Sequence, residues 1–359
     1  MPNLKLSGAT KIYPSGSLAL YDINIETKDK EFLVILGGEA SGKSTLIRVI
    51  AGLEDLTSGE ISMGGKNVTD ADPKERDVAV VFRNGNLNAN ANVYDNIAYG
   101  LKIRKASQTV IDQRVKSVAE ILGLTDVLYR KPKVLTAAQR LRVAVGRAVV
   151  REPDLYLFDE PLAGLDAKLQ GELLNLIINM QARMEGTFIY ATKSAAEALT
   201  IGKRIAVIKN GIIQQIDSPA NLYDYPANSY VAFMIGSPTI NFYNKAKIVS
   251  TDGDVFVEEG SFKLRLSEKI LKRFEKVDGY CNTQKGVIAG IRPEDIKKDG
   301  SIDPDRLYLF DGETHLTLLA RDGGYTDTGF VEAAYVPPAF KEEEQIIKKH
   351  KPSDKQKKK

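Results

Sequence analysis

The stretch of sequence that decides the fold is Gly37-Gly38-Glu39-Ala40-Ser41-Gly42-Lys43-Ser44-Thr45. It follows an apolar run over 32–36 that predicts a buried strand, and it opens a helical pattern over 46–51. A G-x-x-x-x-G-K-[ST] loop in this context predicts phosphate binding, because backbone N–H groups and the helix N-terminus form a positive concavity. Lys43 is expected to reach the β- and γ-phosphates of a nucleotide, and the Ser44 hydroxyl to bind Mg²⁺. The context disfavours the alternative, a glycine-rich turn before an ordinary helix.

The composition is typical of a globular protein. The 359 residues are 43% hydrophobic and 27% charged, and this length predicts two domains. The net charge of +3 is too small to indicate a class of partner. The single cysteine, Cys281, excludes a disulfide framework and is typical of a reducing cytosol. The sequence shows neither an apolar run of about 18 residues nor a signal-peptide pattern, so we expect a cytoplasmic protein that meets a membrane only through other subunits.

Strand and helix patterns alternate along the chain and predict an α/β domain with a largely parallel core sheet. Strand patterns cover 4–12, 17–27, 59–63, 77–82, 155–158, 187–192, 204–208 and 212–216, and helical patterns cover 93–104, 108–122, 140–150 and 167–184. We expect a first domain over 1–236 and a small β-rich second domain over 237–340. The charged tail over 341–359 is expected to be a disordered, solvated end rather than a contact for nucleic acid or anionic lipid.

Three further motifs carry candidate chemistry. Asp159 and Glu160 end a buried strand in the Walker B form, where Asp159 is expected to hold Mg²⁺ and Glu160 to polarise an attacking water. An ordinary acidic turn is the alternative. Tyr13 is either a turn aromatic or a platform for a nucleotide base. Thr136 and Gln139 have the T-x-x-Q form of a capping box, which by itself favours only a well-capped helix.

With these motifs in order, the chain resembles the ATP-binding subunits of ABC sugar importers of the maltose and multiple-sugar type. The likeness covers residues 4–240, and Gly-Ile-Arg-Pro-Glu-Asp at 290–295 extends it. Tyr13 falls at the family's adenine-stacking aromatic, 37–45 at its Walker A loop, and Asp166 in its D-loop. The resemblance implies a P-loop, ABC-type nucleotide-binding domain and a smaller, shortened, OB-like β-rich domain at the C-terminus.

The resemblance also implies a mechanism and partners. Two cassettes would pair head to tail, as a homo- or heterodimer, and sandwich two ATP molecules with Mg²⁺. Each nucleotide would meet one subunit's Walker motifs and the other's signature loop, which here is Leu135-Thr136-Ala137-Ala138-Gln139. Membrane permease subunits and, indirectly, a solute-binding protein are the implied partners. The subunit would then be peripheral on the inner face of the cell membrane and couple ATP hydrolysis to import of a sugar or similar solute.

This sequence departs from the family at positions that in the family close the ATP site and hydrolyse the nucleotide. The two glycines of the family's LSGGQ signature are Ala137 and Ala138, whose methyl groups are expected to keep a phosphate away from the backbone. Arg83 stands at the Q-loop glutamine position and offers no acceptor for water or Mg²⁺. Lys193 stands at the switch-histidine position and lacks an acceptor nitrogen. Glu39 brings negative charge to the phosphate loop, which should weaken binding unless it points outward.

Two hypotheses follow from these departures. The chain is either the ATP-binding subunit of an importer with impaired hydrolysis, or a non-hydrolysing, regulatory or decayed subunit paired with a competent cassette. The loop at 84–92 also lacks the aromatics that in the family receive the permease's coupling helix. A soluble ABC protein acting on ribosomes or DNA is disfavoured, because such proteins carry two cassettes or an inserted coiled coil. A nucleic-acid partner is therefore not expected.

Overall fold

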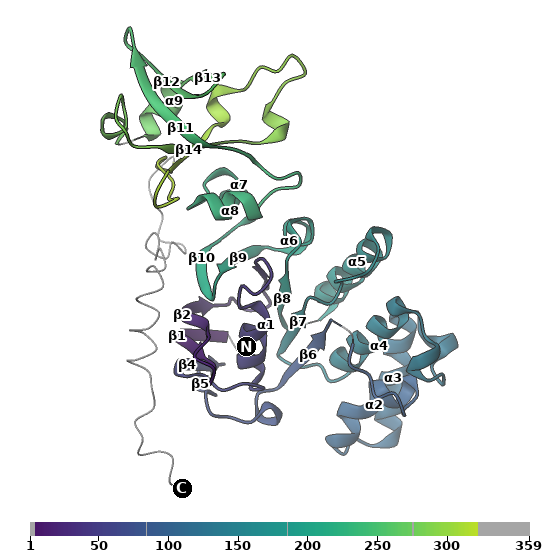
Figure 1. Cartoon of the computed structure of the whole chain (residues 1–359). Helices are drawn as coiled ribbons and strands as arrows, with labels where there is room; N and C mark the ends of the chain where they lie inside the picture. Colours follow the sequence, from purple (N-terminus) through teal and green to yellow (C-terminus); the bar gives the residue numbers. More distant parts are fainter. Residues whose placement is uncertain (1–3, 84, 185, 275, 322–359) are drawn as a thin grey trace, which may run out of the picture. The chain divides into compact units, whose positions relative to one another are not determined.

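The computed structural model describes residues 4–83, 85–184, 186–274 and 276–321. These residues form two compact units (Figure 1). The first unit holds the described residues up to Lys203 together with Ile208–Ile212, and the second holds Arg204–Val207 and the described residues from Ile213 onward. The predicted domain boundary at residue 236 stays a prediction. The predicted tail at 341–359 lies outside the described residues.

The first unit is built on a parallel sheet. Its strands pair in the order β3 (Phe32–Leu36), β8 (Thr187–Thr192), β7 (Leu155–Asp159) and β6 (Val78–Phe82). Every residue of β3, β7 and β8 is buried, as expected for central parallel strands covered on both faces. The ring of Phe188 packs against several aromatic neighbours, with Tyr156 closest at 4.5 Å between ring centroids. The apolar runs therefore fold as the sequence predicts.

A second, antiparallel sheet of this unit follows the alternating pattern of the N-terminal sequence. Its order is β2 (Leu18–Glu26), β1 (Leu4–Ile12), β4 (Ser58–Met63) and β5 (Lys66–Asn67). Buried and exposed positions alternate along much of β1 and β2, which is typical of a sheet with one face on the core. The predicted strands at 4–12, 17–27 and 59–63 are thereby confirmed.

The helices of the first unit form mainly where the sequence shows helical periodicity. They are α1 (Lys43–Ala51), α2 (Val93–Ile103), α3 (Gln108–Ile121), α4 (Ala137–Val149), α5 (Ala167–Arg183) and α6 (Ala195–Ile201). Helix α1 packs on β7 and β8, whereas α2, α3 and α4 pack on one another as a helical group (Figure 1). Within the described ranges, no helix is both long enough and apolar enough to cross a membrane.

The second unit is rich in β-structure. Its antiparallel sheet has the order β13 (Phe262–Arg265), β12 (Asp254–Glu259), β11 (Asn241–Thr251), β14 (Val287–Ile291) and β15 (Tyr308–Asp311). The short helices α7 (Pro219–Asp224), α8 (Ser229–Met234) and α9 (Glu268–Arg273) complete it. The hairpin strands β9 (Arg204–Lys209) and β10 (Ile212–Asp217) are divided between the two units.

A fully buried arginine ties the second unit together. Arg292 is 0% exposed and its Nη1 donates to the carbonyl of Ile235 at 2.6 Å. Its Nη2 donates to the carbonyl of Tyr223 and its Nε to the Tyr308 hydroxyl, both at 3.2 Å. The guanidinium also stacks 3.7 Å from the centre of the Tyr223 ring. One side chain therefore links α7, the residue after α8, and strands β14 and β15.

Candidate functional site

The loop between β3 and α1 contains backbone conformations and close approaches that favour glycine. Gly42, the residue before α1, has a φ of +102°, a backbone conformation that is strained for any residue with a side chain. A Cβ added at Gly37 would lie 2.5 Å from the carbonyl oxygen of Ile208 and from Ser41 Oγ. Ala40 also has a positive φ, of 55°. Glycine at 37 and 42 is therefore a steric requirement of the loop.

The rest of the unit holds this loop in place. The N–H of Gly37 donates to the carbonyl of Thr192 at 3.2 Å, which ties the loop to the end of β8. The N–H of Gly211, in the turn of the β9–β10 hairpin, donates to the carbonyl of Ser41 at 2.8 Å. The carbonyl of Gly211 in turn accepts from the N–H of Tyr21 at 2.9 Å. The loop geometry is thus fixed before any ligand arrives, which lowers the entropy cost of binding.

Lys43 lies at the base of the loop with its charge buried. Its side chain is only 3% exposed and its Nζ lies 3.3 Å from Glu160 Oε1. The same ammonium donates to the carbonyl of Gly38 at 2.5 Å and to Ser41 Oγ at 3.3 Å. A buried ammonium needs such partners, because an unpaired charge is costly to desolvate. The lysine is therefore held in place beside the loop's backbone N–H groups.

Ser44 and Asp159 bring two oxygen atoms together at the start of α1. Ser44 Oγ donates to Asp159 Oδ1 at 2.8 Å. Burial raises the pKa of Asp159, and the nearby charge of Glu160 raises it further, although the hydrogen bond from Ser44 opposes both. A hard divalent cation would relieve this cost, and Mg²⁺ is commonly held by one or two protein oxygens plus phosphates. The pair fits Mg²⁺, and among the described residues no cluster of three or more His, Cys, Asp or Glu competes for a metal.

Glu160 sits in a tight turn at the end of β7. Its φ is 45°, and its N–H donates to the carbonyl of Ala191 at 3.0 Å. A non-glycine residue in the left-handed region is uncommon and is often found at functional sites. The turn directs the carboxylate of Glu160 toward Lys43 rather than away from the loop.

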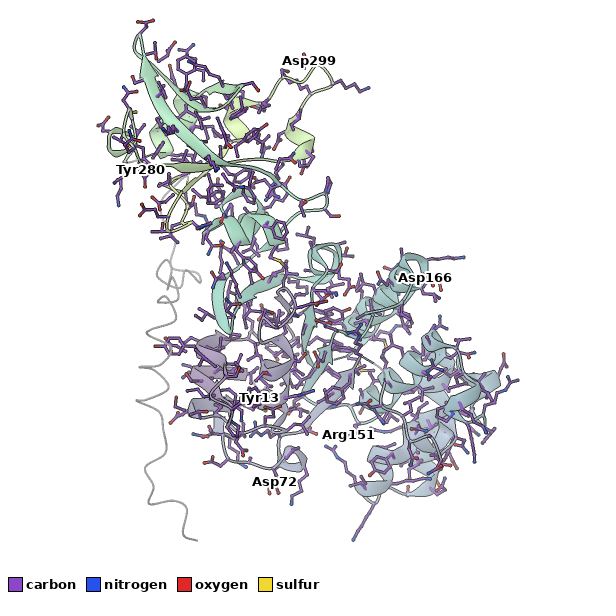
Figure 2. All side chains as sticks on the ribbon, viewed as in Figure 1. Tyr13, Asp72, Arg151, Asp166, Tyr280 and Asp299 are labelled. Atoms are coloured by element: carbon purple, nitrogen blue, oxygen red, sulfur yellow. The ribbon has the colours of Figure 1, made fainter. Side chains whose placement is uncertain are left out.

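These side chains line a single cavity of about 570 Å³. Its charged and hydroxyl-bearing walls include Tyr13, Lys43, Ser44, Arg83, Asp159 and Glu160. Tyr13, labelled in Figure 2, shares a hydrogen bond of 3.1 Å between its hydroxyl and Thr45 Oγ1. The rest of residues 39–45 and the segment 17–19 complete the lining. The structure therefore brings the predicted loop, the acidic pair, Tyr13 and Arg83 into one pocket.

Lys193 and Glu39 form an ion pair beside this pocket. Lys193 Nζ lies 2.7 Å from Glu39 Oε1, and the two side chains are 49% and 83% exposed. The hydrogen bond and charge of Lys193 lower the pKa of Glu39, and Glu39 raises the pKa of Lys193 in the same way. Glu39 is thus largely exposed, but its carboxylate is turned to Lys193 and the residue lines the pocket, so its negative charge stays close to the phosphate loop.

The predicted signature residues and the D-loop aspartate act as helix caps. Thr136 Oγ1 accepts from the N–H of Gln139 at 3.2 Å, and Gln139 Oε1 accepts from the N–H of Thr136 at 3.0 Å. This confirms the capping box, and α4 begins at Ala137 rather than at residue 140. Asp166 caps α5 by accepting from the N–H of Leu169 at 3.0 Å. Ala138 is 9% exposed, whereas Ala137 is exposed.

Comparison with known proteins gives the site its family. A family profile described as ABC transporter matches residues 20–163. The oligosaccharides import ATP-binding protein MsmX of Bacillus subtilis (strain 168) is 45% identical over 296 residues, which is 82% of this chain and 79% of the relative. The trehalose/maltose import ATP-binding protein MalK of Thermococcus litoralis is 44% identical over 302 residues, with the same coverage of 82% and 79%. The chain belongs to the ABC transporter ATP-binding proteins.

Solved structures agree with this ABC assignment. The cbiO1 subunit of an ABC transporter complex from Clostridium perfringens is 28% identical, with a TM-score of 0.58, over 62% of this chain and 90% of that one. A dimeric ATP-binding cassette in a post-hydrolysis state, bound to ADP and Pi, is 27% identical, with a TM-score of 0.55, over 60% of this chain and 98% of that one. By its family, the chain is an ABC ATPase with the α/β fold that the sequence predicts.

Sequence reasoning missed two supports of the ABC site. The first is Gly211, whose only sequence signal is a Lys-Asn-Gly turn. The second is Glu197, which accepts from the hydroxyl of Tyr190 at 2.7 Å and from that of Thr192 at 2.9 Å. The N–H of Glu197 donates to Ser194 Oγ at 3.2 Å, so a buried carboxylate fastens the turn that carries Lys193. The S-x-x-E spacing of Ser194 and Glu197 is a capping-box signal that could have revealed it.

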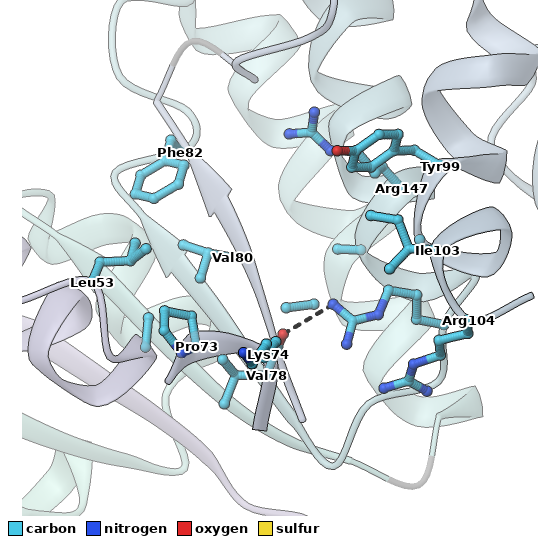
Figure 3. Close-up of a pocket in the computed structure, with 15 residues that line it drawn as sticks. Leu53, Pro73, Lys74, Val78, Val80, Phe82, Tyr99, Ile103, Arg104 and Arg147 are labelled. Carbon is cyan, nitrogen blue, oxygen red and sulfur yellow. Dashed lines mark hydrogen bonds between the residues drawn. The ribbon is translucent and has the colours of Figure 1, made fainter. Parts of the chain in front are cut away.

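The ABC unit also has an apolar groove away from the nucleotide pocket. The groove, of about 530 Å³, is drawn in Figure 3. Its lining includes Leu53, Tyr99 and Ile103, which are 49%, 58% and 64% exposed. Two arginines of the lining bind backbone carbonyls at and after β6: Arg151 donates to the carbonyl of Val78 at 3.2 Å, and Arg147 donates to that of Gly85 at 2.8 Å. Large apolar side chains gathered in one exposed hollow are typical of an interaction surface.

Proposed function

We propose that this chain is the ATP-binding subunit of an ABC importer for an oligosaccharide or related sugar. The proposal is carried by one observation: Lys43, Ser44, Asp159 and Glu160 line a single pocket at a phosphate loop. The similar proteins from Bacillus subtilis and Thermococcus litoralis, named as import ATP-binding proteins, supply the direction and class of transport. The subunit would bind MgATP and work as one of two paired cassettes.

Each group in the pocket has a role under this proposal. Lys43 binds the β- and γ-phosphates, and Ser44 and Asp159 hold Mg²⁺. Glu160 orients the attacking water as general base. Tyr13 offers its ring to the adenine. The segment 136–139 and Asp166 of the second cassette would face the phosphates across the dimer interface, where the N-terminus of α4 provides favourable charge.

Hydrolysis by this subunit is proposed to be slow. Arg83 lines the pocket at the position of the family's Q-loop glutamine, and Lys193 pairs with Glu39 at the position of the switch histidine. Neither side chain can accept a hydrogen bond from water. Losing one positioned catalytic group commonly costs about 10²–10³-fold in rate. The second candidate function, a non-hydrolysing subunit paired with a competent cassette, is favoured by the same two residues.

A steady-state ATPase assay of the purified protein distinguishes these two candidates. We expect turnover within about tenfold of the Glu160→Gln variant, because neither Arg83 nor Lys193 can accept a hydrogen bond from the attacking water. Binding of a fluorescent ATP analogue should persist in Glu160→Gln and be lost in Lys43→Ala. Fast turnover that depends on Glu160 would contradict impaired hydrolysis. Absence of nucleotide binding would contradict the proposed function itself.

We further propose that the apolar groove receives the membrane permease, which would place the subunit on the cytoplasmic face of the membrane. The exposed apolar side chains of Leu53, Tyr99 and Ile103 support this role, since burying them on a partner is favourable. A solute-binding protein would join only indirectly, through the permease.

An Ile103→Glu substitution tests this docking surface. A charge in the groove should reduce co-purification of permease subunits by about tenfold or more, because a buried unpaired charge is costly. Nucleotide binding should be unchanged. The matched control is Ile121→Glu on α3, whose side chain is 43% exposed outside the groove. Equal co-purification with both variants would contradict the proposal.

A further inference from the structure

The ion pair between Glu39 and Lys193 joins two positions that come from different elements. Glu39 belongs to the phosphate loop, and Lys193 follows the last residue of β8. The two elements leave the sheet together, because Leu36 pairs with Thr192 in the parallel register of β3 and β8. The ion pair, with 2.7 Å between Lys193 Nζ and Glu39 Oε1, therefore links the phosphate loop to the residue that follows β8.

Hydrogen bonds hold the backbone on both sides of this ion pair, whereas its two side chains lie at the surface. The buried carboxylate of Glu197 holds Tyr190 and Thr192, and Ser194 caps α6 beside it. The hydrogen bond from Gly211 to Ser41 holds the loop. Lys193 and Glu39 themselves lie at the surface, with exposed fractions of 49% and 83%. Exposed ion pairs are weak and open easily.

Other charges surround the pair and would respond to a phosphate. Lys43 and Arg83 act on the charge of Glu39, and Glu160 and Arg83 act on that of Lys193. A triphosphate bound at Lys43 would repel Glu39 and attract Lys193, since lysine is a flexible cation with three donors. The γ-phosphate and Glu39 are therefore rival anions for one ammonium.

We propose that Glu39 and Lys193 form a latch that the γ-phosphate of ATP opens and ADP leaves closed. In the closed state Glu39 holds Lys193. When ATP binds, Lys193 exchanges the carboxylate of Glu39 for the γ-phosphate, and Glu39 turns to solvent. The inference rests on the proposed nucleotide site and adds to it a device that distinguishes ATP from ADP. The negative charge of Glu39 thereby becomes part of the recognition of the third phosphate.

The latch predicts a specific energetic coupling. Binding ATP must break the ion pair, so Glu39→Gln should tighten ATP binding in the wild-type background. In a Lys193→Gln background there is no ion pair to break, so Glu39→Gln should relieve only the general repulsion between Glu39 and the phosphates. The fold-change in ATP affinity caused by Glu39→Gln should therefore be about two- to fivefold larger in the wild-type background than in the Lys193→Gln background, which is the range of exposed ion pairs. For ADP the ratio should be close to one.

A double-mutant cycle measures this ratio directly. Affinities of Mg²⁺-ATP and Mg²⁺-ADP are determined by calorimetry for the wild-type protein, Glu39→Gln, Lys193→Gln and the double variant. Low ionic strength keeps screening small, and added salt should reduce the ATP ratio. The control is Glu258→Gln, which removes a comparable exposed lysine pair, Lys263 with Glu258 at 3.5 Å, on β12 and β13. It should change neither affinity.

Each outcome supports or overturns the latch. A ratio above about two for ATP but not for ADP supports it. Additive effects on ATP, or the same ratio for ADP, overturn it even though nucleotide binds. If the wild-type protein binds neither nucleotide, and Lys43→Ala changes nothing, the proposed function fails first and the latch fails with it.

Discussion

At the scale of the residue, the two alanines of the signature segment are not equivalent. Ala138 is 9% exposed and is therefore nearly buried. Ala137 is exposed at the first position of α4. The expectation that both methyl groups keep a phosphate away is therefore narrowed to Ala137, because a buried methyl group does not meet a ligand that approaches the helix end from solvent.

Glycine substitutions test this difference. Ala137→Gly should raise ATP turnover by about tenfold or more, as part of the 10²–10³-fold that one well-aligned donor is worth. Ala138→Gly should change turnover by less than about twofold, because Ala138 is nearly buried. Each substitution costs up to about 1 kcal/mol of helix stability, which thermal unfolding would report. Equal gains from both substitutions would contradict the assigned exposure.

The sequence predicts the buried half of the site better than its exposed half. Lys43, Ser44, Asp159 and Glu160 stand in motifs whose strand contexts locate them, and the structure brings them together. The ion pair of Glu39 with Lys193 could not be predicted, because its two residues lie far apart in sequence and both depart from the family pattern. Gly211 was missed for a related reason, since its contribution is made through backbone groups.

At the scale of the element, a single carboxylate fastens the end of β15. Asp311 accepts from the hydroxyl of Tyr280 at 2.5 Å and from the N–H of Thr314 at 2.6 Å. Burial by itself would raise the pKa of Asp311, but these hydrogen bonds outweigh burial and lower the pKa to about 2. The folded pKa thus lies below the ordinary value of about 3.9 for an unfolded chain.

The lowered pKa makes the second unit sensitive to acid. Asp311 stabilises the folded state above about pH 4 and loses this contribution as the pH falls toward 2. Tyr280→Phe should cost about 1 kcal/mol at neutral pH for a partly exposed carboxylate, and little near pH 2. Urea unfolding at a series of pH values measures both. A cost that does not change with pH would contradict this account, as would an equal cost in an Asp311→Asn background.

Helices and strands could be predicted wherever the sequence pattern that specifies them is local. The runs of β3, β7 and β8 are apolar throughout, and side-chain caps mark the start of most helices, as Thr136 does for α4. The division between units falls inside the β9–β10 hairpin, where hydrophobic periodicity is continuous and gives no sign of a change.

At the scale of the whole molecule, the two units differ in the interactions that stabilise them. The first has central parallel strands that are buried at every position, and its functional loop is tied to β8 and to the β9–β10 turn. The second relies on Arg292, which donates to Ile235, Tyr223 and Tyr308. Loss of this side chain would remove the charged donor from the buried carbonyl of Ile235, whereas the carbonyl of Tyr223 would keep the Tyr308 hydroxyl at 3.0 Å.

Arg292→Met should therefore weaken the second unit alone. We expect a loss of about 2–3 kcal/mol of local stability, because the buried carbonyl of Ile235 loses its charged donor. Hydrogen exchange followed along the whole chain should accelerate in β14 and β15 and stay unchanged in β3 and β7. Arg265→Met is the control, since its side chain is 67% exposed in the same unit. Equal acceleration by both variants would contradict a structural role for Arg292.

The hydrogen bond from Gly211 to the phosphate loop has a consequence for the order of synthesis. Chains emerge N-terminus first, at about 5–20 residues per second. Residues 37–45 therefore leave the ribosome well before β8 and the turn at Gly211, which hold the loop in its final shape. A nascent chain carries the full motif without its support. Capture of a nucleotide should thus begin late and abruptly, once residue 211 has emerged, and would mark the moment at which the first unit is complete.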